Sequence, residues 1–262
     1  MAVPAAVILI IVVVLLLVLG GGPRPAGYDA SYPQCPASYP ANALFGVVGV
    51  NGGLAHNANP CLGGELRWAR AAPGQKRPRQ PALSLYIDTG NPGVQVSQWP
   101  KGGTAPVYGA CNGLLTNACS YLYGAQRAAY SYGLVAAQDA AAARTAPWWL
   151  DVELGLSWAG TYQLNIAALQ GYIAGLRNAG VTAPVGVYST SAQWKDITGL
   201  TAQTTARAFS GGLPDWVAGA TGSTRDQARQ NCAGGSFTGA APTLAQYQSG
   251  GFDADLRCTQ PR

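Results

Sequence analysis

The stretch that decides the fold is Trp148-Trp149-Leu150-Asp151-Val152-Glu153, an apolar run that ends in two acidic residues. Aromatic and β-branched side chains favour strands, so this run predicts a buried strand. Side chains two positions apart on a strand share a face and lie about 6 to 7 Å apart along it. We therefore expect Asp151 and Glu153 to point the same way at the end of the strand, with Leu150 and Val152 on the opposite face.

Other short apolar runs alternate with longer helical stretches along the whole chain. This alternation predicts an α/β fold, a modified TIM-type (β/α) barrel that forms a single domain over residues 27–262. The predicted strands cover 27–30, 44–50, 83–88, 148–153, 184–188, 215–218, 244–248 and 252–256. The predicted helices cover 62–71, 119–143 and 165–179. Residues 90–117, rich in Gly, Pro and Asn, are a predicted loop insertion.

The first 22 residues form a separate segment. Residues 2–22 carry no charge and are rich in Val, Ile and Leu, which is typical of a signal peptide or a membrane anchor. Residues 23–26 are a predicted linker. Both alternatives predict a secreted or extracytoplasmic protein, which contacts a membrane only through residues 2–22 if they are not cleaved.

The six cysteines agree with export, because their number is even and none of them forms a CxxC pair. Six cysteines allow fifteen pairings; the favoured disulfide is Cys111–Cys119, which closes a short loop, and this leaves Cys35–Cys61 and Cys232–Cys258 as one choice for the other four. With His56 as the one histidine of the chain, no metal site is predicted.

The charge pattern argues against a nucleic-acid partner. The 262 residues include 16 basic and 11 acidic side chains, and the net charge of +5 is spread without any long basic run. A nucleic-acid interface needs a denser basic face. The sequence also lacks a GxSxG motif, a Walker loop and a dinucleotide fingerprint, so no cofactor is expected.

Carboxylates are scarce, so their positions carry information. Four of them end or lie on the first, third and last predicted strands: Asp29, Asp88, Asp253 and Asp255. The C-terminal strand ends of a βα barrel carry its site, so we expect these four on one rim with Asp151 and Glu153. An isolated acid is more readily explained by a helix cap or an arginine partner, and Asp88 is explained equally well by the turn that follows it.

Clustered carboxylates repel one another, which raises the pKa of at least one of them. Such a group can protonate a glycosidic oxygen while a second, ionised carboxylate supports an oxocarbenium-like transition state. Glu153, longer and nearest the rim, is the predicted acid. Among the aromatic residues near strand ends, Tyr188 and Tyr247 have the polar tip that suits a site, whereas Trp216 fits a sugar contact or core packing equally.

Six short motifs follow one another along the chain, and their order indicates a family. They are Gly27-Tyr28-Asp29-Ala30-Ser31-Tyr32-Pro33-Gln34, Leu150-Asp151-Val152-Glu153, Gly186-Val187-Tyr188, Asp215-Trp216-Val217-Ala218, Gln246-Tyr247 and Phe252-Asp253-Ala254-Asp255. This order resembles the family 25 glycoside hydrolases, which are bacterial and phage lysozymes. Members of that family cleave peptidoglycan between N-acetylmuramic acid and N-acetylglucosamine on a modified βα barrel.

The resemblance implies a general acid at Glu153 and a partner at Asp151, which either orients the substrate N-acetyl group or stabilises the cation. It implies that Asp29 and Asp253 are the first-strand and last-strand acids of the site. The substrate contacts that it implies are Asp88, Tyr188, Trp216, Gln246, Tyr247 and Asp255. The chain departs from the family at residues 50–53, where Val-Asn-Gly-Gly replaces a Lys-Ala-Thr-Glu-Gly-like stretch.

These observations predict an exported glycoside hydrolase of peptidoglycan or a related cell-wall glycan. The alternative is a non-catalytic glycan-binding or envelope-structural protein on the same barrel. A metal-dependent deacetylase would need histidine ligands that the chain lacks.

Overall fold

The computed structural model describes residues 26–35 and 38–259. The predicted signal or anchor segment, 1–22, and all of the predicted linker except Ala26 lie outside the described residues. In the part of the chain that is described, no helix is both long and apolar enough to cross a membrane.

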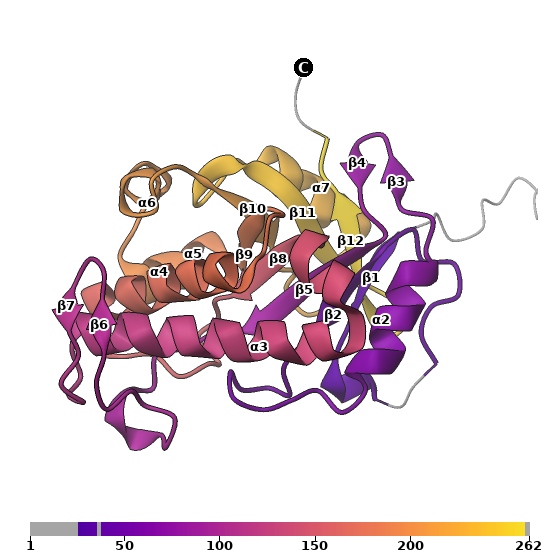
Figure 1. Ribbon diagram of the computed structural model, residues 1–262. Coiled ribbons are helices and arrows are strands. Elements are labelled where there is room, and N and C mark those ends of the chain that lie inside the picture. The colour runs from indigo at the N-terminus through magenta and orange to yellow at the C-terminus, as the bar shows by residue number, and fades with distance from the viewer. Residues whose placement is uncertain (1–25, 36–37, 260–262) are drawn as a thin grey trace, which may run out of the picture.

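Eight strands close into a barrel, as the alternation of apolar runs predicts (Figure 1). Around the barrel they are β1 (Gly27–Ala30), β2 (Gly46–Gly49), β5 (Leu83–Asp88), β8 (Trp148–Asp151), β9 (Val185–Ser189), β10 (Leu213–Val217), β11 (Gly239–Ser249) and β12 (Phe252–Arg257). The first seven run parallel, whereas β12 is antiparallel to both of its neighbours, β11 and β1. The predicted end of β8 is wrong by two residues, since the strand stops at Asp151 and Glu153 begins the following loop.

The three predicted helices are confirmed as α2 (Leu62–Ala71), α3 (Asn117–Thr145) and α4 (Tyr162–Ala179). Three shorter helices follow the later strands and were not predicted: α5 (Ser191–Thr198), α6 (Ala202–Ala208) and α7 (Arg225–Ala233). Each of these three starts after a threonine whose hydroxyl accepts a hydrogen bond from a backbone N–H three residues later. Such a cap is the ordinary start signal of a helix.

Helix α3 is broken near its end, although the sequence predicts one uninterrupted helix. Asp139 has φ −159° and ψ 89°, far from helical values. Its Oδ1 accepts a hydrogen bond from the Ala142 N–H at 2.9 Å, so Asp139 caps the last turns as a helix start. Its other oxygen binds Arg70 of α2, which ties the two helices together at the break.

Helices α3 and α4 lie side by side along the barrel in Figure 1, and glycines set their spacing. A Cβ on Gly124 would lie 2.0 Å from the Ala168 carbonyl oxygen, and one on Gly171 would lie 2.0 Å from that of Tyr121. Both distances are far below van der Waals contact, so only glycine permits this approach of the two backbones.

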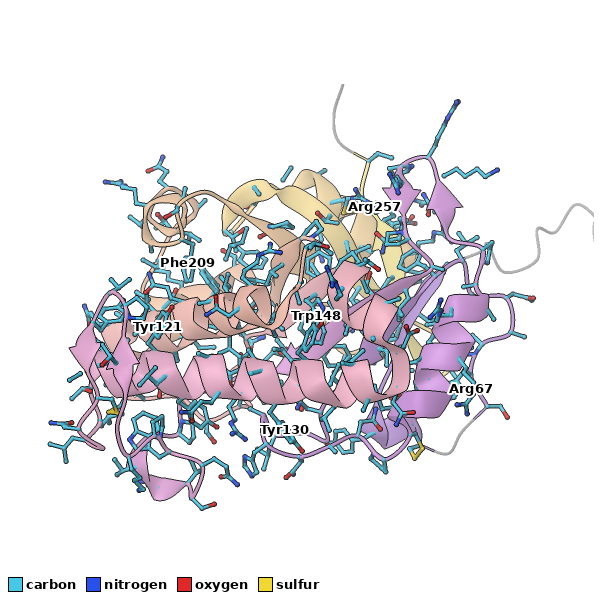
Figure 2. All side chains as sticks on the ribbon, in the orientation of Figure 1. Arg67, Tyr121, Tyr130, Trp148, Phe209 and Arg257 are labelled. Atoms are coloured by element: carbon cyan, nitrogen blue, oxygen red, sulfur yellow. A yellow bond between two sulfur atoms is a disulfide. The ribbon has the colours of Figure 1, made fainter. Side chains whose placement is uncertain are left out.

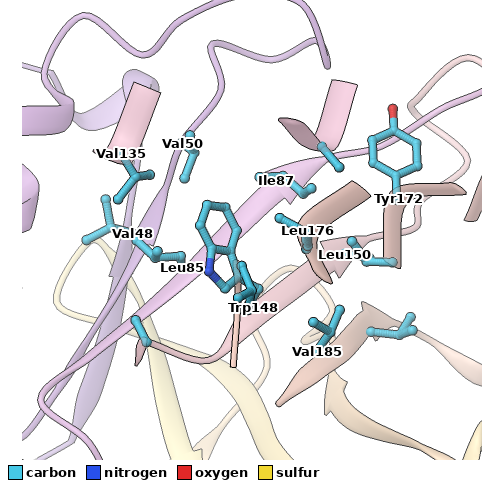
Figure 3. Packing of buried hydrophobic residues seen from close by; sticks show 14 of the residues in the cluster. Val48, Val50, Leu85, Ile87, Val135, Trp148, Leu150, Tyr172, Leu176 and Val185 are labelled. Atoms are coloured by element: carbon cyan, nitrogen blue, oxygen red, sulfur yellow. The ribbon is translucent and has the colours of Figure 1, made fainter. Parts of the chain in front are cut away.

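The barrel is packed on both of its faces. Outward side chains such as Leu85, Trp148 and Val185 meet α3 and α4 (Figure 3). Inside the barrel, Phe45, Val47, Trp149, Trp216 and Leu244 form a second cluster. Because successive strand residues alternate between these two layers, the register decides which polar residues point inward.

The predicted insertion, residues 90–117, is a small folded unit. It contains a 3₁₀ turn (Gly93–Gln95) and a hairpin of β6 (Thr104–Ala105) and β7 (Gly109–Ala110). Trp99, Ala105 and Cys111 pack there on the start of α3. The three predicted disulfides are confirmed: Cys35–Cys61, Cys111–Cys119 and Cys232–Cys258.

Candidate active site

Six carboxyl groups gather where the parallel strands end and the antiparallel strand β12 begins. We call them the acidic cluster: Asp29, Asp88, Asp151, Glu153, Asp253 and Asp255. Their proximity is reflected in their pKa values, since the charges of Glu153, Asp88 and Asp29 all act on Asp151. The charge of Asp253 acts in turn on Asp29 and Asp255. All four predicted catalytic residues are therefore members of one cluster.

Asp151 and Glu153 differ in their surroundings, although they are two residues apart. Asp151 is 8% exposed, and its Oδ1 has no hydrogen-bond partner among the described residues. Burial, and then the charge of Glu153, raises the pKa of Asp151 well above its usual value. Glu153 is partly buried at the edge of the loop, where the Trp158 indole N–H donates to its backbone oxygen at 2.8 Å.

Gln193, on the first turn of α5, holds Glu153 in place and was missed in the sequence. Its Nε2 donates to Glu153 Oε1 at 3.2 Å, while its Oε1 accepts from the Leu154 N–H at 2.7 Å. The Gln193 N–H is itself held by the Thr190 hydroxyl at 3.1 Å. The pattern of Thr190 followed three residues later by glutamine is a helix-start signal that could have located this side chain.

A chain of hydrogen bonds crosses the barrel beside Asp151 and Glu153. Tyr188 OH donates to Gln246 Oε1 at 2.8 Å, and Gln246 Nε2 donates to Asp29 Oδ2 at 3.0 Å. Gln246 Oε1 also accepts from the Gly219 N–H at 3.1 Å. Both ends of the Gln246 amide are thus used within the protein, so its visible role is to position Asp29 and Tyr188.

Asp29 and Asp255 form a buried carboxyl pair. Burial, and then the charge of Asp253, raises the pKa of Asp29 to about 8. Asp255 is 1% exposed, and burial together with the Asp29 charge raises its pKa well above the usual range. The two groups share a hydrogen bond, which requires a proton on one of them. The Trp216 indole N–H donates to Asp255 Oδ1 at 2.8 Å and fixes the pair from below.

Two more acids complete the cluster. Asp88 lies beside Asp151 in the register of β5 and β8, and burial raises the pKa of Asp88 to about 6. The Gly53 N–H, after β2, donates to Asp88 and limits this rise. Asp253 is partly buried, and burial raises its pKa while a hydrogen bond with Gln248 lowers it.

Of the predicted substrate contacts, Trp216 and Tyr247 are placed away from the surface of the cluster. Trp216 is 1% exposed and lies under the acids, with its ring centroid 4.3 Å from that of Tyr188 and 6.0 Å from that of Trp149. A sugar ring cannot reach it, so the alternative of core packing holds for Trp216. Tyr247 follows Gln246 on β11 and so faces the outside, where it packs with Ala228 of α7.

The remaining predicted contacts, Asp88, Tyr188, Gln246 and Asp255, lie within or directly beside the acidic cluster. Among the described residues, no group of three or more His, Cys, Asp or Glu side chains is arranged to hold a metal ion. The chemistry that the cluster offers is proton transfer. Burial and mutual proximity raise the pKa of five of its carboxyl groups, that of Asp29 to about 8, while Glu153 lies at the accessible edge.

Comparisons with known proteins agree with this picture. A family model described as "Lysozyme-like protein 1" matches residues 116–229, less than half of the chain, a stretch that includes Asp151, Glu153 and Gln193. No curated protein matches the chain in sequence.

Two solved structures share the fold. A muramidase from Trichobolus zukalii is 13% identical, with a TM-score of 0.51, over 90% of this chain and 95% of its own. A bacterial lysozyme from Streptomyces coelicolor is 17% identical, with a TM-score of 0.52, over 90% of this chain and 93% of its own. The chain is therefore similar to lysozyme-like proteins in its central sequence and to a muramidase and a lysozyme in its fold, which confirms the resemblance seen in its motifs.

Proposed function

We propose that the protein is an exported glycoside hydrolase that cleaves peptidoglycan or a related cell-wall glycan. The observation that carries the proposal is the Asp151 and Glu153 pair within the acidic cluster. Burial, and then the charge of Glu153, raises the pKa of Asp151 well above its usual value, so the pair holds a proton more readily than two isolated carboxylates would. Glu153 delivers that proton to the glycosidic oxygen, and its position is supported by Gln193.

Asp151 is the partner of this acid. Its Oδ1, buried and without a partner among the described residues, is available to accept an N–H from a substrate N-acetyl group. The same carboxyl group stabilises positive charge at the sugar when it is ionised. The pair Asp29 and Asp255 lies beside it and adds negative charge as it loses its proton.

Export is supported by the three disulfides, which persist in oxidising compartments. The apolar segment at residues 2–22 supports it as well.

The proposal is tested with Glu153→Gln, which keeps the size of the side chain and removes the proton. We expect release of reducing ends from purified cell walls to fall by about 100-fold or more. The matched control is Glu65→Gln, because Glu65 is the other glutamate of the chain and binds Asn59 and Tyr39 near α2, away from the cluster. Equal activity of Glu153→Gln and wild type would remove Glu153 from the mechanism.

The same assay decides for the alternative, a non-catalytic glycan-binding protein. One observation favours that alternative: β2 is followed by Asn51 instead of an acid, and the Asn51 amide is bound to Ser131 at 3.2 Å. Binding of wild type to cell walls with no release of reducing ends at any pH from 4 to 9 would establish it.

A further inference from the structure

A cavity lies at the opposite end of the barrel from the acidic cluster. We call it the floor pocket; it has a volume of about 440 Å³, within the range of small-molecule sites. Its lining includes Arg79, Trp149, Pro147, Pro184, Pro214 and Arg257. Pro147 and Pro184 directly precede β8 and β9, so the pocket opens where the parallel strands begin.

Two short strands outside the barrel lie over this end. They are β3 (Gln75–Lys76) and β4 (Arg79–Gln80), which form a hairpin. Figure 2 places Arg257, the last residue of β12, beside this hairpin. The Arg257 Nε–H donates to the Arg79 backbone oxygen at 3.1 Å, which fixes the hairpin over the pocket.

The pocket is positively charged and lacks a counter-charge. None of the residues that line it is acidic. Within residues 26–35 and 38–259 neither Arg79 nor Arg257 forms an ion pair. The Arg257 Nη1 binds two backbone oxygens, those of Thr243 at 2.6 Å and Cys258 at 3.1 Å, so its guanidinium group is held rigidly.

The rest of the lining consists of four prolines and Trp149, with Gln80, Thr145 and Thr243 as its uncharged polar residues. Trp149 is 3% exposed, and its indole N–H is buried with no hydrogen-bond partner in the described part of the chain. The prolines add rigid ring faces, which lose little entropy when a flat body packs on them.

From this cavity we infer a binding site for a small carboxylate that carries a planar or ring-shaped apolar body. The carboxylate lies between the guanidinium groups of Arg79 and Arg257, and the body packs on the prolines and on Trp149. This site is independent of the proposed hydrolysis, because the acids and the floor pocket lie at opposite ends of the barrel.

The test is calorimetric titration of the full chain with benzoate, with cyclohexanecarboxylate and with the neutral analogue benzamide. We expect one of the two carboxylates to bind and benzamide to bind roughly tenfold more weakly, because it lacks the charge. The stronger of the two carboxylates tells whether the apolar body of the natural ligand is a planar aromatic ring or a saturated ring. Absence of binding by both at millimolar concentration, or equal binding of benzoate and benzamide, overturns the inference.

Variants locate the site. Arg79→Gln should weaken binding of the carboxylate by roughly three- to tenfold, a modest factor because Arg79 is exposed. Arg77→Gln, in the same hairpin but outside the lining, is the matched control and should change nothing. The indole N–H resonance lost in Trp149→Phe should shift in wild type as the ligand is added. Equal weakening by both arginine variants, or an unmoved Trp149 resonance, contradicts the site.

Discussion

The two ends of the barrel are built from the same strands, yet one gathers six carboxyl groups and the other presents two guanidinium groups. At the acidic end, burial and mutual repulsion raise the pKa of Asp29 to about 8 and that of Asp88 to about 6. At the floor pocket, the Arg257 guanidinium group donates hydrogen bonds to backbone oxygens. At the acidic end, ionisation of the buried carboxyl groups is therefore unfavourable, as it often is in catalytic sites. At the floor pocket, by contrast, the hydrogen bonds of Arg257 stabilise the fold.

The largest difference between the ends should appear in the pH dependence of stability. Since the pKa of Asp29 is raised from 3.8 to about 8, the folded state binds its proton more tightly than the unfolded state. Its stabilising contribution is complete below pH 3.8 and is lost as pH rises through 8. Asp29→Asn mimics the protonated form, so it should raise the free energy of unfolding at pH 9 by on the order of 2–5 kcal/mol and leave it unchanged at pH 3.5.

Denaturant titrations at the two pH values measure this effect. The control is Asp226→Asn, whose carboxylate is exposed on α7 and bound to Arg229. Parallel pH profiles for wild type and Asp29→Asn would show that the acidic end is not electrostatically strained.

At the floor, Arg257→Leu should lower stability by about 1–3 kcal/mol, because it leaves the Arg79, Thr243 and Cys258 carbonyl oxygens without this donor. The loss should be the same at pH 5 and pH 9, since no acid pairs with Arg257 in the described residues. Thermal unfolding at both pH values checks it, with Arg79→Gln as a variant of little effect. A loss that varies with pH would mean that the two ends are electrostatically coupled.

The smallest expected effect concerns the positioning of Glu153. Gln193→Ala removes the bonds to Glu153 Oε1 and Leu154 N–H, so cell-wall hydrolysis should fall by roughly three- to tenfold with little change in stability. Gln227→Ala is the matched control, because Gln227 occupies the same capping position of α7. A loss in both variants alike would point to helix capping rather than to the acid.

Much of this barrel can be predicted from the sequence because short apolar runs of four to six residues suit buried strands. The runs at 27–30 and 83–88 coincide with β1 and β5. The strand predicted over 148–153 is too long, because the chain leaves β8 after Asp151 and Glu153 is then bound by Trp158 and Gln193. Trp158 and Gln193 lie outside this strand, so the sequence pattern of the strand does not reveal their contacts.

The candidate site, like the barrel, could be predicted from the sequence only in part. The convergence of acids follows from their place at strand ends, so it could be predicted. The error over Tyr247 could have been avoided, because adjacent residues of a strand face opposite sides and Gln246 faces inward. The burial of Trp216 depends on Trp149 and Tyr188 from neighbouring strands, so the sequence alone left two alternatives for it.

Strand β12 connects the two ends, because its antiparallel direction lets Asp253 and Asp255 reach one end and Arg257 the other. All three alternate with Phe252, Ala254 and Leu256 on a six-residue strand. Insertion of a single residue would exchange the faces, turning three charges out of the barrel and three apolar side chains into it. Lineages of this protein should therefore vary the outward residues Phe252, Ala254 and Leu256 more readily than the length of β12.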